Sequence, residues 1–211
     1  MIFLTNEVVE RYQNLNKTVK KQGIIFTGSS LMEQFPVEEF FTGNIYNRGV
    51  SGFTTPEYLQ VLDTLIFDLK PNWIFINIGT NDLNNPDYQL DELLANYQII
   101  LQQINEKLPS TRVTFLEFYP VNPDKMAKIG ENTPWLKEVI PFRTNQKLME
   151  ANQKIRALMT EYDYESYSVN HVLVDKDGNL QGELSTDGIH LNRKAYRLIA
   201  NELSKLIEQE K

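Results

Sequence analysis

Three side chains of this sequence, a hydroxyl, a carboxylate and an imidazole, could act together to activate a nucleophile. Ser30 stands in a Gly-Ser-Ser-Leu run that directly follows the apolar segment 23–27. Near the other end of the chain, Asp187 precedes His190 by three residues. A serine hydroxyl needs a base to accept its proton, and the base needs a carboxylate that fixes its tautomer. These residue types therefore predict acyl transfer through a covalent acyl-serine.

The small number of histidines limits which residue can be the base. The 211-residue chain has no cysteine, which excludes disulfides, thiolate catalysis and Cys-based zinc sites. Its two histidines are His171 and His190. His171 has no carboxylate at a useful offset except Asp175 and precedes a Val-Leu-Val run, so we interpret it as structural. A metal hydrolase would need more ligands at set spacings, and we expect neither a metal nor another cofactor.

Charge and hydropathy exclude several classes of partner. The chain has 21 basic and 28 acidic residues, a net charge of −7, and no basic cluster interleaved with aromatic residues. We therefore expect no nucleic-acid partner. Residues 1–21 alternate apolar and charged positions, and nowhere do about 18 apolar residues run together. The sequence thus predicts a cytoplasmic protein without integral membrane association, and it leaves open whether the protein forms a homo-oligomer.

The hydrophobic period alternates between short apolar runs and helical spacing, which is typical of an α/β fold. No linker or like-charge block divides residues 1–211, so we expect a single domain with a helical extension at residues 1–21 packed on it. Strands that are apolar on both faces predict a parallel sheet of about five strands in a flavodoxin-like three-layer sandwich. The expected strands are 24–26, 45–46, 73–78, 113–118 and 164–168, and the expected helices are 8–19, 55–69, 90–108, 148–162 and 196–206. The second of these helices is expected to have Thr55 as its cap and Pro56 at its first position.

Four polar clusters are expected to meet at one edge of this sheet. They occupy residues 28–31, 47–52, 79–82 and 187–190, and each follows an expected strand. In parallel sheets, ligands bind outside the carboxyl ends of the strands, in the loops that lead into helices. Side chains that are distant in sequence should therefore converge on one site.

In this order, the four clusters resemble the motifs of the SGNH, or GDSL-type, esterases and acylhydrolases. The resemblance covers nearly the whole chain and extends to members similar to platelet-activating-factor acetylhydrolases and to carbohydrate acetylesterases. It implies that Ser30 is the nucleophile and that Asp187 and His190 complete the triad. It also implies an oxyanion hole that is formed by the backbone N–H groups of Ser30 and Gly52 and by the side-chain amide of Asn81.

The sequence departs from the family's name motif at one position, where Ser29 replaces Asp. Members with a Gly-Ser-Ser run occur among those that resemble acetylesterases, so the resemblance implies a change of substrate more than of activity. We therefore expect hydrolysis of short-chain, acetyl-like esters of small molecules. The alternative within this class is a lysophospholipase-like acylhydrolase.

The segment 118–142 is long for a connection between a strand and a helix, and it shows no clear hydrophobic period. Loops of this kind at the ligand edge commonly form walls or lids, and Tyr119 and Trp135 are candidates for contact with the substrate. Bulky walls stiffened by proline would narrow the acyl pocket. Alternatively, Trp135 packs on the surface or on a second subunit. No segment is amphipathic and rich in basic and aromatic residues, which argues against a true lipase.

Each cluster by itself has an ordinary structural explanation. Ser30 could cap a helix, and the later clusters could be turns. An α/β-hydrolase nucleophile elbow is excluded because Met32 occupies the place of its second glycine. A flavodoxin-like phosphate- or nucleotide-binding module would explain the first cluster but would give no task to Asn81, Asp187 or His190. The joint occurrence of the clusters favours the hydrolase.

Overall fold

The computed structural model describes residues 2–208, and the chain forms one five-stranded sheet in the order β2-β1-β3-β4-β5. All neighbouring strands are parallel. The strands are β1 (Ile24–Gly28), β2 (Ile45–Gly49), β3 (Trp73–Asn77), β4 (Arg112–Leu116) and β5 (Glu165–Tyr167). Every residue of β3 is buried, as expected for a central strand that is covered on both faces. The predicted parallel α/β sheet is confirmed.

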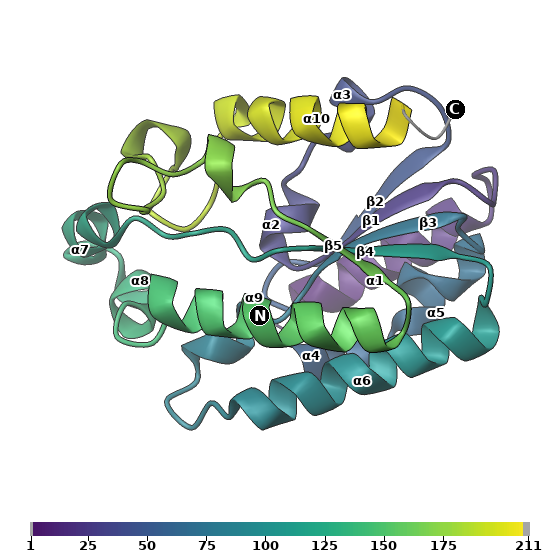
Figure 1. Cartoon of the computed structure of the whole chain (residues 1–211), viewed down its shortest axis with the longest axis horizontal. Helices are drawn as coiled ribbons and strands as arrows, with labels where there is room; N and C mark the ends of the chain where they lie inside the picture. Colours follow the sequence, from purple (N-terminus) through teal and green to yellow (C-terminus); the bar gives the residue numbers. More distant parts are fainter. Residues whose placement is uncertain (1, 209–211) are drawn as a thin grey trace.

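Helices cover both faces of the sheet, with α3 and α10 above it and α6 and α9 below it in Figure 1. On one face lie α1 (Ile2–Asn16), α4 (Thr55–Leu59), α5 (Leu62–Leu65), α6 (Leu90–Lys107) and α9 (Asn145–Glu161). On the other face lie α2 (Ser30–Glu33), α3 (Val37–Phe40) and α10 (Arg193–Glu208). Short 3₁₀ turns occur at η1 (Phe67–Leu69), η2 (Asp82–Asn84), η3 (Asn170–Val172) and η4 (Gly182–Leu184). Two further helices, α7 (Pro123–Gly130) and α8 (Pro134–Val139), lie beyond one end of the sheet (left in Figure 1).

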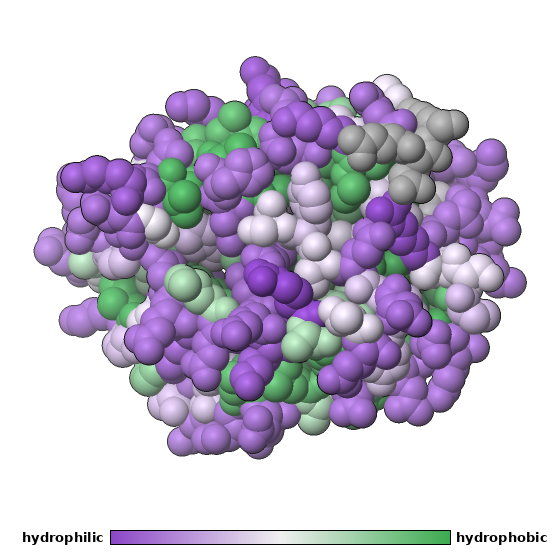
Figure 2. Space-filling model, viewed as in Figure 1, coloured by the Kyte–Doolittle hydropathy of each residue, from purple (hydrophilic) through white to green (hydrophobic). Residues whose placement is uncertain are grey.

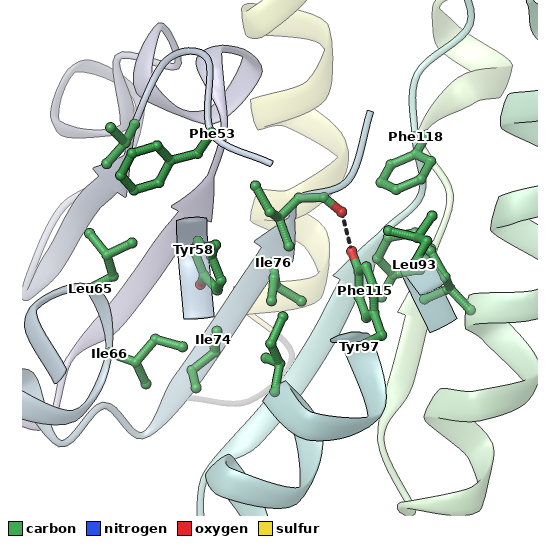
Figure 3. Packing of buried hydrophobic residues seen from close by; sticks show 14 of the residues in the cluster. Phe53, Tyr58, Leu65, Ile66, Ile74, Ile76, Leu93, Tyr97, Phe115 and Phe118 are labelled. Carbon is green, nitrogen blue, oxygen red and sulfur yellow. Dashed lines mark hydrogen bonds between the residues drawn. The ribbon is translucent and has the colours of Figure 1, made fainter. Parts of the chain in front are cut away.

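Side chains of each strand alternate between two hydrophobic cores because successive residues point to opposite faces of a sheet. In β3, Ile74 and Ile76 pack with α4, α5 and α6, whereas Phe75 packs with α10 on the other face. The first of these cores is shown in Figure 3, where the Tyr97 hydroxyl donates a hydrogen bond to the Ile78 carbonyl (2.6 Å). This bond satisfies a buried polar group just beyond the carboxyl end of β3.

The carboxyl ends of three strands lie side by side and at the same level. Gly28 at the end of β1 is in register with Gly49 of β2 and with Asn77 of β3. The chain leaves β1 toward β2 on one side and later returns to β3 on the other, so the strand order reverses between β1 and β3. Such a switch point leaves a crevice for ligands. The loops after these three strands are those that contain the first three polar clusters.

The helix that was expected from Thr55 differs in its cap. α4 is capped by Thr54, whose backbone N–H donates to the Glu57 carboxylate (2.8 Å) as part of a capping box. Thr55 is the first helical residue, and its backbone N–H and hydroxyl instead donate to Asp82. The prediction of Thr55 as the cap is therefore wrong by one residue, and Pro56 occupies the second helical position.

The expected helix 55–69 is also interrupted. It is divided into α4, α5 and η1 by Val61 and Ile66, whose φ angles of −128° and −131° leave the helical range. A side chain of α1 compensates, since Asn16 donates its amide N–H to the Thr64 carbonyl (2.8 Å). Because this carbonyl has a partner from another helix, the segment does not need a continuous helix to satisfy it.

The surface carries few large apolar side chains. On the face in Figure 2, hydrophilic side chains dominate and apolar ones form small separate groups. Among residues 6–208, the exposed large hydrophobic residues come from four different helices, α1, α6, α8 and α9, and are Leu15, Ile99, Trp135 and Met149. No helix within residues 2–208 has both the length and the apolar character that a bilayer span requires.

Candidate active site

The three residues that the sequence singled out first form one hydrogen-bonded chain. The Ser30 Oγ lies 3.0 Å from His190 Nε2, and His190 Nδ1 lies 2.7 Å from Asp187 Oδ2. Ser30 comes from the end of β1, whereas the other two come from the loop before α10. This arrangement places a base on the hydroxyl and a carboxylate on the far side of the base, as proton abstraction from a serine requires.

The carboxylate of Asp187 is held by the loop that carries it. Its Oδ1 accepts hydrogen bonds from the backbone N–H groups of Ile189 (2.9 Å) and His190 (2.7 Å). Partial burial by itself would raise the pKa of Asp187, but the hydrogen bonds from the His190 ring and from the backbone prevail and lower that pKa below its usual value. The carboxylate is therefore ionised at neutral pH and can stabilise an imidazolium.

The loop of Asp187 and His190 is anchored to the start of α7. Gly188 has a φ of +97°, and a Cβ at this position would lie 2.5 Å from the Met126 side chain. The Asn122 backbone N–H donates to the Gly188 carbonyl (2.8 Å), and the Ser185 hydroxyl donates to the His190 carbonyl (2.7 Å). Glycine at position 188 permits both the backbone conformation and this close approach. The segment that follows β4 thus helps to hold the imidazole in place.

The short helix α2 that begins with Ser30 is fixed by a side chain from β2. Asn47 donates to the carbonyls of Met32 and Phe35 (2.8 Å for the second), and its oxygen accepts from the Gly49 N–H (2.8 Å). On the other side of α2, Tyr196 of α10 donates to the Leu31 carbonyl (2.9 Å). The Ser30 backbone is therefore held from two directions. Asn47 belongs to the second polar cluster, but no pattern in the sequence indicated that it would hold α2.

The groups expected to form an oxyanion hole lie in three successive loops. Within residues 2–208, the backbone N–H groups of Ser30 and Gly52 donate to no protein acceptor. Gly52 lies in an exposed turn with a φ of +84°, a conformation that glycine adopts without strain. Asn81 donates one amide hydrogen to the Phe53 carbonyl (2.9 Å), which ties the loop after β3 to the turn that contains Gly52. These donors remain free to bind an oxyanion.

The two aromatic residues proposed for substrate contact lie in different surroundings. Trp135, in α8, is 45% exposed, and its ring centroid lies 5.9 Å from that of His190 in an edge-on contact. Tyr119 is only 2% exposed and packs in the core beside α10. Burial raises the pKa of the Tyr119 hydroxyl far above its usual value. Trp135 is thus at the site, whereas Tyr119 is part of the core.

This chain matches a known family over most of its length. The profile of the GDSL-like lipase/acylhydrolase family matches residues 31–198, which is most of the chain. The chain belongs to this family. The resemblance that the four polar clusters indicated is confirmed.

This chain is similar over most of its length to several known proteins, and one solved structure has a similar fold. N-acylneuraminate cytidylyltransferase of Escherichia coli is 23% identical over 210 residues, which cover 95% of this chain but 46% of that protein. Platelet-activating factor acetylhydrolase IB subunit alpha2 of Homo sapiens is 26% identical and covers 90% of this chain and 78% of that protein. A structure from Streptococcus pneumonia, solved under the name of a platelet activating factor, has a TM-score of 0.83 and 30% identity over 96% of this chain and 92% of its own. This chain therefore spans less than half the length of the cytidylyltransferase.

Sequence reasoning did not find Arg143, and it placed Asp82 in the third polar cluster without a role. Arg143 donates from Nη2 to the Thr80 carbonyl (2.6 Å) and to Asn81 Oδ1 (2.8 Å). Asp82 accepts from Thr55 at the start of α4, and burial raises its pKa although these hydrogen bonds act in the opposite direction. An arginine that follows an irregular segment is normally exposed, so its type and position carried no signal of a buried role.

The second histidine lies on the surface of this GDSL-like chain. The side chain of His171 is 61% exposed, and its Nε2 lies 3.5 Å from the Glu202 carboxylate. It makes no contact with Ser30. In the part of the chain that the structure describes, no three His, Asp or Glu side chains are grouped as metal ligands would be.

Proposed function

We propose that this chain hydrolyses short-chain carboxylic esters through an acyl-serine, with Ser30 as nucleophile, His190 as base and Asp187 as its orienting carboxylate. The observation that carries the proposal is the hydrogen-bonded chain from Ser30 Oγ through His190 to Asp187. Its position at the carboxyl ends of the strands, where the strand order reverses, supports it. Membership of the GDSL-like lipase/acylhydrolase family supports the reaction class.

The first half of the reaction forms the acyl-serine. His190 Nε2 accepts the Ser30 proton as Oγ attacks the ester carbonyl carbon, and the carbonyl electrons move to its oxygen. Asp187 stabilises the imidazolium that results. The free N–H groups of Ser30 and Gly52 and the Asn81 amide donate to the oxyanion. When the intermediate collapses, the carbon–oxygen bond to the alcohol breaks and His190 gives its proton to the leaving oxygen.

The second half repeats these steps with water as the nucleophile. His190, which is again neutral, accepts a proton from water as the water oxygen attacks the acyl carbonyl. The same donors bind the second oxyanion. Collapse of this intermediate breaks the bond to Ser30 Oγ, which takes the proton back from His190. The products are a carboxylic acid, an alcohol and the free enzyme.

The proposal also includes a preference for esters with a short acyl chain. The long connection after β4, which contains α7 and α8, packs against the Gly188 loop of the triad, and a connection of this length at the ligand edge supports a walled acyl pocket. An acyl chain that cannot be buried loses about 0.8 kcal/mol of binding for each methylene. On the face shown in Figure 2, the apolar side chains form small separate groups and offer no continuous surface for a lipid aggregate there. The name of the human acetylhydrolase relative also supports an acetyl-like substrate.

We expect kcat/KM to be highest for acetyl or butyryl esters and to fall for octanoyl and longer esters. A series of p-nitrophenyl esters from acetyl to decanoyl, assayed below their solubility limits, measures this preference. Acetylated sugars then test which alcohol the enzyme accepts. A kcat/KM that climbs steadily to decanoyl, or activation by lipid droplets, would favour the lysophospholipase-like alternative and leave the triad intact.

The contact between Trp135 and His190 supports a role for Trp135 on the alcohol side of the ester. His190 must protonate the leaving oxygen, so the alcohol lies next to the imidazole while the acyl group lies away from it. A half-exposed indole beside that ring can stack on a sugar ring or an aryl group. Aromatic contacts of this kind contribute about 0.5–1.5 kcal/mol beyond the area that they bury.

Trp135→Ala is therefore expected to reduce kcat/KM for p-nitrophenyl acetate roughly three- to tenfold, with little effect on ethyl acetate. The two substrates share the acetyl group, so their ratio isolates the alcohol. Trp135→Phe serves as the matched control and should restore most of the difference. An equal loss for both esters would show that Trp135 acts by supporting His190 and not by contact with the alcohol.

A further inference from the structure

Arg143 is a buried cation whose hydrogen bonds end on the loop after β3. It directly precedes the cap residue of α9 and is only 5% exposed. Its Nη2 donates to the Thr80 carbonyl (2.6 Å) and to Asn81 Oδ1 (2.8 Å), which lie 63 and 62 residues away in sequence. Its Nε has no partner within the described residues. Arg143 therefore connects the end of the α8 segment to the third polar cluster.

Burying the Arg143 guanidinium costs free energy, and no ion pair within the described residues offsets that cost. Burial lowers the pKa of Arg143 to about 10, although the negative charges of Asp187 and Asp82 act in the opposite direction. An arginine in a protein interior is stable only when it is paired and hydrogen-bonded. No carboxylate makes an ion pair with Arg143 within residues 2–208, and its Nη2 donates instead to the Thr80 carbonyl and the Asn81 amide oxygen. The hydrogen bonds of this buried cation therefore go to Thr80 and Asn81, in the loop after β3.

The orientation of the Asn81 amide follows from these bonds. Its oxygen accepts from Arg143, so its nitrogen faces the opposite way, and there one hydrogen goes to the Phe53 carbonyl (2.9 Å). An amide nitrogen carries two hydrogens, which leaves one to donate. Phe53 directly follows Gly52, so the same bond aligns the amide with the turn that carries the Gly52 N–H. The positive charge of Arg143, which donates to the amide oxygen, also polarises the N–H groups of that amide.

We propose that Arg143 is a positioning residue of the oxyanion hole, which holds the Asn81 amide so that its free N–H meets the negative charge of the tetrahedral intermediate. This inference rests on the proposed ester hydrolysis by Ser30. Arg143 touches neither the substrate nor the reacting atoms, and it acts through Asn81. Its contribution should therefore appear in kcat and should depend on the presence of Asn81.

Arg143→Met tests the proposal because it removes the charge and every donor but keeps a long unbranched side chain. We expect kcat for p-nitrophenyl acetate to fall about tenfold to a hundredfold, which is part of the cost of losing a hole donor, with KM changed less than about threefold. Arg143→Lys keeps the charge without the planar fork and should recover part of kcat. Circular dichroism and thermal melting establish that each variant is folded.

A double-mutant cycle with Asn81→Ala distinguishes positioning from a general structural role. If Arg143 acts through Asn81, Arg143→Met lowers kcat in the Asn81→Ala background by less than about twofold. Equal losses in both backgrounds, or an unchanged kcat in the wild-type background, overturn the proposal. If Arg143→Met does not fold, the cycle is run with Arg143→Lys and judged by the same criterion.

Arg156, in α9, provides the control. Its Nε donates to the Glu117 carboxylate (2.9 Å) just after β4, outside the four polar clusters. Arg156→Met should leave kcat within about twofold of the wild type. Activity that persists in Ser30→Ala would refute the proposed hydrolysis itself. An inactive Ser30→Ala with a fully active Arg143→Met would refute only the positioning role.

Discussion

Replacement of Ser30 by alanine is expected to lower kcat at least about a thousandfold and to leave the fold intact. The hydroxyl is the group that His190 deprotonates across a 3.0 Å contact, and alanine offers no atom that could carry the acyl group. The side chain is small and lies at the start of a short helix, so its removal creates almost no cavity. Steady-state rates with p-nitrophenyl acetate, together with thermal melting, measure both parts of this expectation.

His190→Ala should be as damaging as Ser30→Ala, and the double variant should be little worse than either single one. The reason is that triad members act as a unit, so the second loss removes nothing that still functions. His171→Ala is the control, since that side chain lies on the surface and pairs with Glu202. Near-normal turnover in Ser30→Ala would refute the mechanism, and a large rate loss in His171→Ala would show that the wrong histidine was chosen.

Asn81→Ala is expected to lower kcat about a hundredfold to a thousandfold and to change KM much less. The free amide hydrogen is directed at a charge that exists only in the transition state, and such interactions affect kcat more than ground-state binding. The measurement is kcat and KM for a short-chain ester at a fixed pH.

Asn85→Ala is the matched control for Asn81→Ala. Asn85 is an exposed asparagine that follows η2, and its side chain accepts a hydrogen bond from the Asp87 backbone (2.9 Å). The Asn85→Ala variant should leave kcat within about twofold of the wild type. A rise in KM with an unchanged kcat in Asn81→Ala would make that residue a binding or turn residue instead of an oxyanion donor.

Hydrophobic periodicity was enough to predict most of the sheet and the long helices. The run 73–76 is apolar at successive positions and is buried on both faces, whereas Leu90–Lys107 repeats its apolar residues at helical spacing. The hydrophobic pattern did not predict the structure correctly where contacts with distant residues compete with local helix formation. The segment 55–69 has a continuous helical face, but Asn16 bonds its Thr64 carbonyl and the helix is interrupted. The segment 118–142 showed no period because its helices α7 and α8 are short and bury few residues.

Residue type and order alone determined the candidate triad and the family of this chain. A serine after an apolar strand and an Asp and His three residues apart have few other joint uses, and the parallel topology brings their loops together. Only the tertiary structure decided which neighbours support them. Arg143 and Asn81 are 62 residues apart, and no local pattern reports a hydrogen bond across that distance. The same holds for Tyr119 and Trp135, which are both aromatic in one irregular segment, because burial depends on the elements packed around a residue and not on its own identity.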